Sequence, residues 1–133
     1  MEERLYREKL LEIYRNPQNR GEISNPDLEA KMVNPLCGDE IKLQLKLANR
    51  QLPIANRKIQ KAVFSGNGCA ISQASASILA NHIEGRKLAE IKKLDVSDVL
   101  KLVGVNPSPA RLKCAVLSLE VLKEAINGVQ GKS

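Results

Sequence analysis

Three cysteines and one aspartate carry most of the chemistry that this sequence suggests. Cys37 and Asp39 flank a glycine in a short loop. Cys69 comes directly after the turn 66–68, which contains two glycines, and Cys114 lies in the first turns of an expected helix. The positive end of a helix favours thiolate, the form of cysteine that acts as a nucleophile and as a soft metal ligand. The glycines let the backbone come close to a bound ion.

Cys37, Asp39, Cys69 and Cys114 together form a candidate metal site. Three thiolates and one carboxylate complete a tetrahedral set of zinc ligands. The same set is incomplete for an iron–sulfur cluster unless the carboxylate or an outside group takes the fourth place. A carboxylate binds a soft metal less well than a fourth thiolate would. Such a site should therefore open more readily than a structural site made of four cysteines.

Two other interpretations of these residues stay open at the level of sequence. Free cysteines are among the most buried residues, so the three could be unrelated core residues, and no C-x-x-C pair marks a zinc site. Asp39 alone would suit a turn. A purely structural zinc site is the second alternative, against which the carboxylate and the glycine-containing loops argue.

His82 is the only histidine, and we expect it to take no part in this site. It follows Cys69 on the same expected helix, and 13 residues of helix span about 20 Å. An ordinary, partly exposed helix histidine is the better interpretation. Without a second histidine, little supports histidine-based acid–base catalysis, and no phosphate-binding Gly-x-x-x-x-Gly-Lys-Ser/Thr loop is found in the sequence.

The composition is that of a globular protein with an aliphatic core. The chain has 133 residues, 43% hydrophobic and 27% charged, which predicts one domain over residues 1–133. Aromatic residues make up only 2%, which argues against stacking platforms for single-stranded nucleic acid. The net charge of +6 comes from basic residues spread along the chain. This indicates solvated faces first and an acidic protein partner second.

The sequence contains no signal that would place the protein in or across a membrane. No apolar run is long enough to span a bilayer. The start Met1-Glu2-Glu3-Arg4 lacks the charged-then-apolar pattern of a signal peptide. We therefore expect a cytoplasmic protein without a membrane partner. In that reducing compartment, an odd number of cysteines does not suggest a disulfide framework.

The first half of the chain predicts one helix and a small sheet. An amphipathic pattern favours a helix over residues 3–15, which Asn16-Pro17 should end. A polar loop follows, then a short strand over residues 30–33. Residues 40–48 alternate strictly between apolar and polar, which is typical of a strand with one wet face. A less regular strand over residues 58–65 should pair with it as a hairpin.

The second half predicts helices. A Ser- and Ala-rich segment, 70–84, should form a close-packed helix ended by Gly85, followed by short helices near 87–92 and 95–103. Ser108-Pro109 is a helix start, and the last helix should stop at Gly128. Its expected buried stripe consists of Leu112, Val116, Leu119, Leu122 and Ile126. The predicted fold class is α+β, a small antiparallel sheet of about three strands packed against helices.

Three segments carry a resemblance to a known family. They are Asn34-Pro35-Leu36-Cys37-Gly38-Asp39, the run from Gly66 to Ser77 around Cys69, and Arg111-Leu112-Lys113-Cys114-Ala115. In this order they resemble the IscU/SufU/NifU-N family of iron–sulfur cluster assembly proteins, over nearly the whole chain. Ala70 and Lys113 stand where IscU-type members have Gly and His. The resemblance is therefore to the SufU-like branch, with a shortened segment between the second and third cysteines.

The resemblance implies a fold, a site and two candidate functions. The fold would be the IscU/SufU-like sandwich, and the ligands would be the four residues named above. The SufU-like function is a zinc-dependent sulfurtransferase that accepts persulfide sulfur from a cysteine desulfurase, with Cys37 as the acceptor. Downstream partners would be an iron–sulfur scaffold or apo-protein acceptors. The alternative is a scaffold that assembles and transfers a [2Fe–2S] cluster on the same ligands, so whether the protein is an enzyme stays open.

Overall fold

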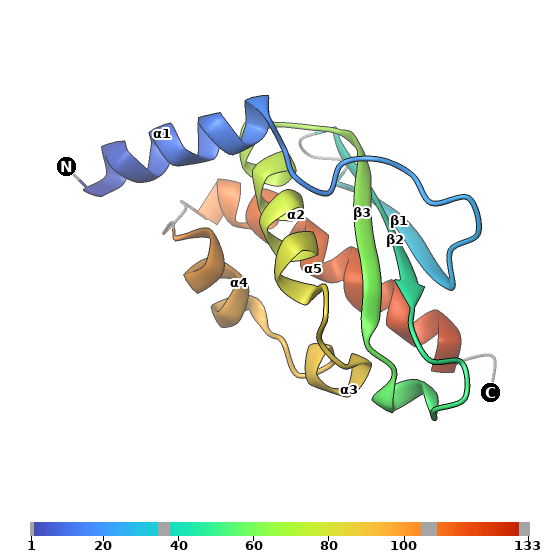
Figure 1. The fold of residues 1–133 in the computed structure, drawn as a ribbon. Helices are drawn as coiled ribbons and strands as arrows, with labels where there is room; N and C mark the ends of the chain where they lie inside the picture. Colours follow the sequence, from blue (N-terminus) through green and yellow to red (C-terminus); the bar gives the residue numbers. More distant parts are fainter. Residues whose placement is uncertain (1, 35–37, 105–108, 131–133) are drawn as a thin grey trace.

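A three-stranded antiparallel sheet in the order β1–β2–β3 forms one layer of the molecule (Figure 1). The strands are β1 (Leu28–Asn34), β2 (Asp39–Leu47) and β3 (Ile59–Asn67). The structure is a computed structural model that describes residues 2–34, 38–104 and 109–130, with side chains for 8–34, 38–104 and 112–127. The predicted hairpin of the two long strands is confirmed, because β2 pairs with β3 in antiparallel register.

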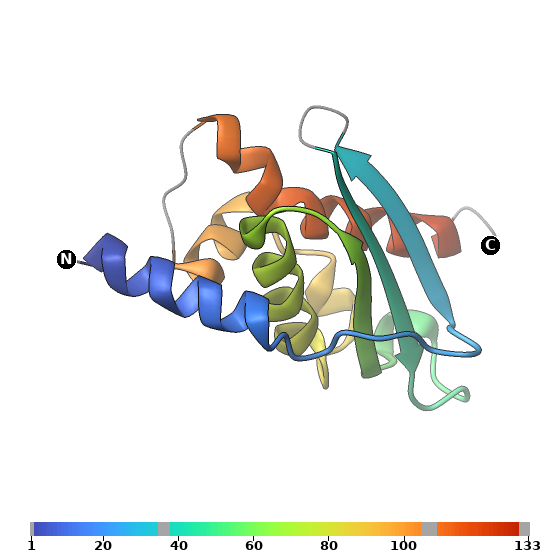
Figure 2. The same cartoon turned by 90° about the horizontal axis from the view of Figure 1, so that it is seen from above.

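Helices cover one face of this sheet (Figures 1 and 2). Both α2 (Ala70–Ile83) and α5 (Pro109–Gln130) pack against the strands and against each other. The N-terminal α1 (Glu2–Arg15) packs on α2, and α4 (Val96–Val103) packs on α2 and α5. A short α3 (Leu88–Ile91) and a 3-10 turn, η1 (Ile54–Asn56), complete the elements. The α+β fold class expected from the sequence is confirmed.

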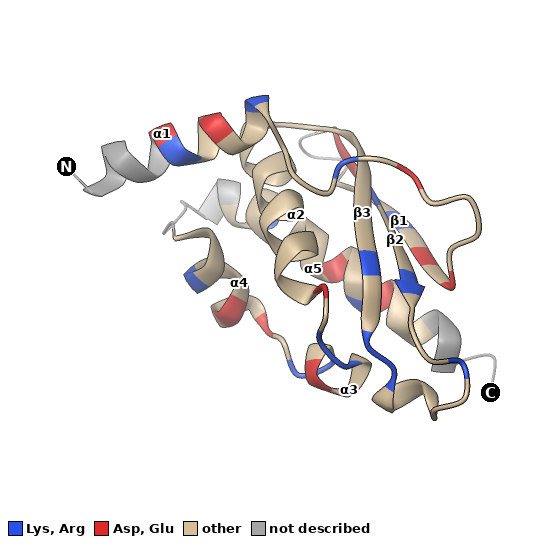
Figure 3. Cartoon of the chain, in the orientation of Figure 1, with Lys and Arg blue, Asp and Glu red and all other residues tan. Residues whose placement is uncertain are grey.

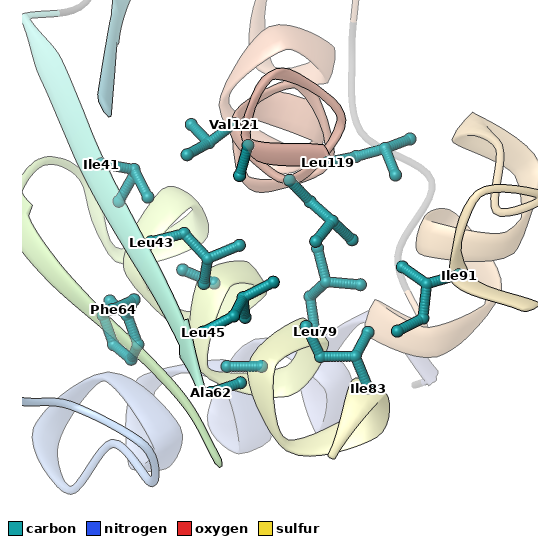
Figure 4. Packing of buried hydrophobic residues seen from close by; sticks show 14 of the residues in the cluster. Ile41, Leu43, Leu45, Ala62, Phe64, Leu79, Ile83, Ile91, Leu119 and Val121 are labelled. Carbon is teal, nitrogen blue, oxygen red and sulfur yellow. The ribbon is translucent and has the colours of Figure 1, made fainter. Parts of the chain in front are cut away.

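The core lies between β2 and the two central helices (Figure 4). Ile41, Leu43 and Leu45 alternate along β2 and face α2 and α5, where Leu79 and Val121 are also fully buried. Each fully buried aliphatic side chain contributes about 1.5–3 kcal/mol relative to an exposed one. The alternation that predicted β2 therefore also sets which face of the sheet the helices cover.

The second face of the sheet is more buried than the alternation of apolar and polar residues in β2 suggests. Gln44 is buried, although it lies on the predicted wet face of β2. The segment between α1 and β1 crosses that face, and the Ile23 N–H donates to Gln44 Oε1 at 2.9 Å. Gln44 Nε2 donates in turn to Glu29 Oε2 at 2.8 Å. A covering loop of this kind leaves no periodic signal in the sequence of the strand that it covers.

Several element boundaries differ from the sequence predictions, among them those of the first strand and the last helix. The first strand begins at Leu28, two residues earlier than expected. The last helix runs through Gly128 to Gln130, so the predicted stop at Gly128 is wrong. Glycine inside a helix costs about 1 kcal/mol relative to alanine, which is small beside the packing of a long helix. The expected stripe is also too narrow, because every residue from Cys114 to Leu119 is buried.

Charged side chains are mixed over most of the molecule, but some basic residues that are distant in sequence come together (Figure 3). Lys58 and Lys87 face each other across an isolated β-bridge. Arg86 is beside them and lies 3.9 Å from the Glu90 carboxylate. Within the described ranges, no helix is long and apolar enough to cross a bilayer.

Candidate metal centre

Three of the four predicted site residues meet at one end of the sheet. Asp39 is the first residue of β2, Cys69 directly precedes α2, and Cys114 lies in the second turn of α5. One carboxylate oxygen and the two Sγ atoms all lie within 4.8 Å of one another. Cys37, the fourth predicted residue, lies outside the described residues. Cys69 and Cys114 are therefore not scattered core cysteines.

The sheet register brings Asp39 and Cys69 together. Asp39 pairs with Asn34 at the end of β1, and the next residue, Glu40, pairs with Asn67 at the end of β3. The chain then makes the turn through Gly68 into Cys69. A carboxylate at the start of one strand and a thiol just beyond the end of its neighbour thus meet at the same edge of the sheet.

Asp39 is buried and accepts a hydrogen bond from the backbone. Its side chain is 1% exposed, its Oδ1 accepts from the Cys69 N–H at 2.9 Å, and its Oδ2 lies 3.9 Å from Cys69 Sγ. No lysine or arginine of the described ranges forms an ion pair with it. A buried carboxylate is costly unless a cation or several hydrogen bonds compensate it. The environment of Asp39 therefore suits a bound cation.

Cys69 is the N-cap of α2. Its backbone is extended (φ −71°, ψ 167°), and its Sγ accepts from the Ser72 N–H at 3.5 Å. The Ser72 hydroxyl donates back to the Cys69 carbonyl at 3.0 Å. The thiol thus lies at the positive end of the helix, where negative charge is stabilised. We did not anticipate Ser72 from the sequence, because the capping pattern that a sequence reveals has Glu or Gln three positions after the cap.

Two glycines make this close approach sterically feasible. A Cβ on Gly68 would lie 2.5 Å from Ser72 Oγ and 2.7 Å from Asp39 Oδ1. Gly66 has φ +127°, and its Cβ would collide with the Glu40 carbonyl oxygen. Glycine at 66 thus lets β3 lie close to the β2 backbone, and glycine at 68 lets the turn lie close to Asp39 and Ser72.

The three described ligand atoms fit a small metal ion. Zinc–sulfur bonds of about 2.3 Å place two sulfurs about 3.8 Å apart in a tetrahedron. Atoms within 4.8 Å of one another need to approach by only about 1 Å to reach that spacing. Thiolates with a carboxylate suit zinc, and they also suit iron. The donor set thus supports a metal site without selecting one metal.

His82 lies at the other end of α2 from Cys69, in its last turn. Partial burial lowers the pKa of His82, the Arg86 guanidinium lowers it further, and the Asp98 carboxylate opposes both effects. The continuous helix keeps this histidine away from the centre, in agreement with the sequence analysis. Asp98 instead forms a capping box with Asp95 at the start of α4.

Comparisons with known proteins agree on one family. The family model described as NifU-like N terminal domain matches residues 5–133. The zinc-dependent sulfurtransferase SufU of Bacillus subtilis is 33% identical, with 96% of this chain and 92% of that protein covered. The iron-sulfur cluster assembly scaffold protein IscU of Escherichia coli K12 is 32% identical, with 96% and 95% covered.

A solved structure supports the fold independently. The N-terminal part of a nitrogen-fixing NifU-like protein from Brucella abortus superposes with a TM-score of 0.73 at 21% identity. The match covers 96% of each chain. At this level of identity the likeness concerns the fold alone, and it agrees with the sheet-and-helix architecture described above.

Proposed function

The chain belongs to the NifU-like N-terminal domain family of iron–sulfur cluster assembly proteins, and on this premise we propose that it accepts persulfide sulfur from a cysteine desulfurase at a zinc site. The proposed ligands are Cys37, Asp39, Cys69 and Cys114. The family resemblance noted in the sequence is confirmed. The zinc and the sulfur chemistry are our proposal, supported by the 33% identity to a zinc-dependent sulfurtransferase.

One observation carries the proposal. Side chains from β2, α2 and α5 place two thiols and a buried carboxylate within 4.8 Å of one another. Segments this distant in sequence do not bring such groups together by local geometry. A buried carboxylate without a described cation partner and a thiol capping a helix are both stabilised by a cation between them.

The residues of this chain would have distinct roles in sulfur transfer. When bound, zinc would keep the cysteines as thiolates and hold them in place. Asp39 binds a soft metal less well than a thiolate does, which makes its bond the easiest to release. We assign Cys37 as the acceptor, on the resemblance.

The transfer step balances without an added oxidant or reductant. The Cys37 thiolate attacks the outer sulfur of the desulfurase persulfide and forms a new S–S bond with it. The S–S bond within the desulfurase persulfide breaks, and its cysteine leaves as a thiolate. The chain then carries the persulfide on Cys37, ready for a downstream scaffold or apo-protein acceptor.

Mass spectrometry of the protein after incubation with a cysteine desulfurase and cysteine tests this proposal. We expect one added sulfur on the peptide that contains Cys37 and stimulation of the desulfurase, and Cys37→Ala should abolish both. Leu52→Ala, an exposed loop substitution, is the control and should behave as wild type. Sulfur on Cys69 or Cys114 would contradict the assignment of Cys37. No added sulfur on any cysteine would reject sulfur acceptance.

The same ligands favour a second function, a scaffold for a [2Fe–2S] cluster. The 32% identity to IscU over 96% of this chain supports it, and so does a donor set that suits iron as well as zinc. Anaerobic incubation with iron and sulfide should then give a coloured, oxygen-sensitive protein, and Asp39→Ala should make the colour persist longer by slowing release. A protein that stays colourless would exclude the scaffold and leave the sulfurtransferase.

A further inference from the structure

Arg20 lies between α1 and β1, yet its guanidinium contacts residues 66–73, the segment that contains Cys69. Its Nη1 donates to Gln73 Oε1 at 2.6 Å, and its Nη2 donates to the Gly66 carbonyl at 3.0 Å. Its Cζ also lies 5.5 Å from the centre of the Phe64 ring. These contacts join one side chain to the end of β3 and to the start of α2.

The two hydrogen bonds of Arg20 flank the ligand residue. Gly66 is the second-to-last residue of β3, just before the turn into Cys69, and Gln73 lies in the first turn of α2. The Gln73 N–H donates to the Cys69 carbonyl at 3.1 Å. Arg20 therefore connects the chain before Cys69 to the chain after it, without reaching the sulfur itself.

The backbone at Arg20 is fixed independently of its side chain. The Phe64 N–H donates to the Asn19 carbonyl at 2.9 Å, and the Gly21 N–H donates to the Phe64 carbonyl at 3.0 Å. Asn19 Nδ2 adds a bond to the Ala62 carbonyl at 2.9 Å. The segment thus lies along the free edge of β3, and the guanidinium extends from a rigid base towards the turn.

The turn has little packing on the side where Arg20 lies. A hollow of about 280 Å³ is found there, lined by Arg20, Gly66, Gly68 and Gln73 among others. Gln73 is 3% exposed, and its Nε2 has no hydrogen-bond partner in the described part of the chain. Its Oε1 accepts the hydrogen bond from Arg20 Nη1. The turn is therefore held in place by hydrogen bonds from a charged donor, whereas apolar packing holds the elements elsewhere in the fold.

We propose that Arg20 is a positioning residue for the metal centre. It holds the segment 66–73 in the conformation that places Cys69 Sγ close to the side chains of Asp39 and Cys114. This inference rests on the proposed metal site and adds a residue outside the four ligands. It also links the segment after α1 to the centre, so that changes in that segment reach Cys69 through two hydrogen bonds. Residues that orient metal ligands typically change metal affinity about 10–100-fold when they are removed.

Zinc affinity, measured by competition with a chromophoric chelator, tests this role. Arg20→Met keeps the aliphatic stem and removes every donor, and it should weaken zinc binding about 10–100-fold. Arg20→Lys restores one donor and should recover part of the loss. Arg50→Met removes an exposed arginine of the β2–β3 connection and should bind zinc as wild type does. Wild-type affinity in Arg20→Met would overturn the proposal.

Amide hydrogen exchange of the metal-free proteins separates local positioning from general destabilisation and from failure of the zinc proposal. Arg20→Met should speed exchange at residues 68–73 while the strands keep wild-type protection, and Arg50→Met should change neither. Should wild type bind no zinc at all, the proposed metal fails, and this measurement still decides the role of Arg20. Unchanged exchange at 68–73 would overturn that role. Exchange that is faster to the same degree over the whole chain would also overturn the positioning role of Arg20.

Discussion

At the residue scale, the geometry of the centre depends on groups that offer no ligand atom. Gly66 and Gly68 are two positions apart, but added methyl groups would meet different neighbours. At Gly66 the obstacle is the backbone of β2, and the positive φ adds strain. At Gly68 the obstacles are the side chains of Asp39 and Ser72. Side chains can move aside where a paired strand cannot.

The two glycine-to-alanine substitutions should therefore have separable effects. Gly66→Ala should destabilise the fold by more than about 1 kcal/mol, because alanine is strained at positive φ and β2 cannot yield. Gly68→Ala should leave the free energy of unfolding closer to wild type but displace the Asp39 carboxylate and weaken zinc binding. Urea unfolding of the metal-free proteins and chelator competition measure the two quantities. Equal zinc affinity in Gly68→Ala and wild type would contradict this account.

At the scale of elements, α5 joins the candidate metal centre to the core. Its second turn carries Cys114, and the helix packs against β1, β2, α2 and α4. Because it lies between the sheet and other helices, it is buried on more than one face. The ligand therefore has a rigid support, while the core residues further along the helix contribute stability without touching the centre.

Leu122→Ala should separate these contributions. Leu122 is 0% exposed, and truncating a fully buried leucine typically costs about 2–5 kcal/mol. Leu52, at 43% exposed, is the matched control, and Leu52→Ala should change stability by less than about 0.5 kcal/mol. Urea unfolding gives both values. The zinc affinity of folded Leu122→Ala should stay within about twofold of wild type, because the folded protein keeps its ligands in place. A much larger loss of affinity would show that α5 does not act as a rigid support.

At the scale of the whole molecule, the centre exists only in the folded chain. Asp39, Cys69 and Cys114 come from three separate elements and meet through the strand register and the packing of two helices. An ion that binds this arrangement and not the unfolded chain stabilises the fold by mass action. Metal binding and folding should therefore be coupled.

Removal of the metal should lower the thermal unfolding temperature. Free zinc at a hundred times its dissociation constant contributes about 2.7 kcal/mol, which corresponds to a shift on the order of 10 °C for a chain of this size. Scanning calorimetry with zinc and after chelator treatment measures the shift, and Cys69→Ser should abolish most of it. An unfolding temperature that zinc does not change in wild type would contradict metal binding at these residues.

Sequence by itself determined the local features of this protein. Alternation in β2, the end of α1 before Asn16-Pro17 and the glycine turn before Cys69 depend on near neighbours in the chain, and the structure agrees with them. The residue types at the four site positions also indicated a metal. The tertiary structure places three of them together, and Cys37 stays a sequence-based assignment.

Only the tertiary structure decided which distant groups meet. The burial of Gln44, the contacts of Arg20 with Gly66 and Gln73, and the continuation of α5 through Gly128 have no signal in the local sequence. The first two depend on contacts between segments that are far apart in the chain. Local preferences amount to about 1 kcal/mol per residue or less, so burial and long-range hydrogen bonds override them wherever the two compete.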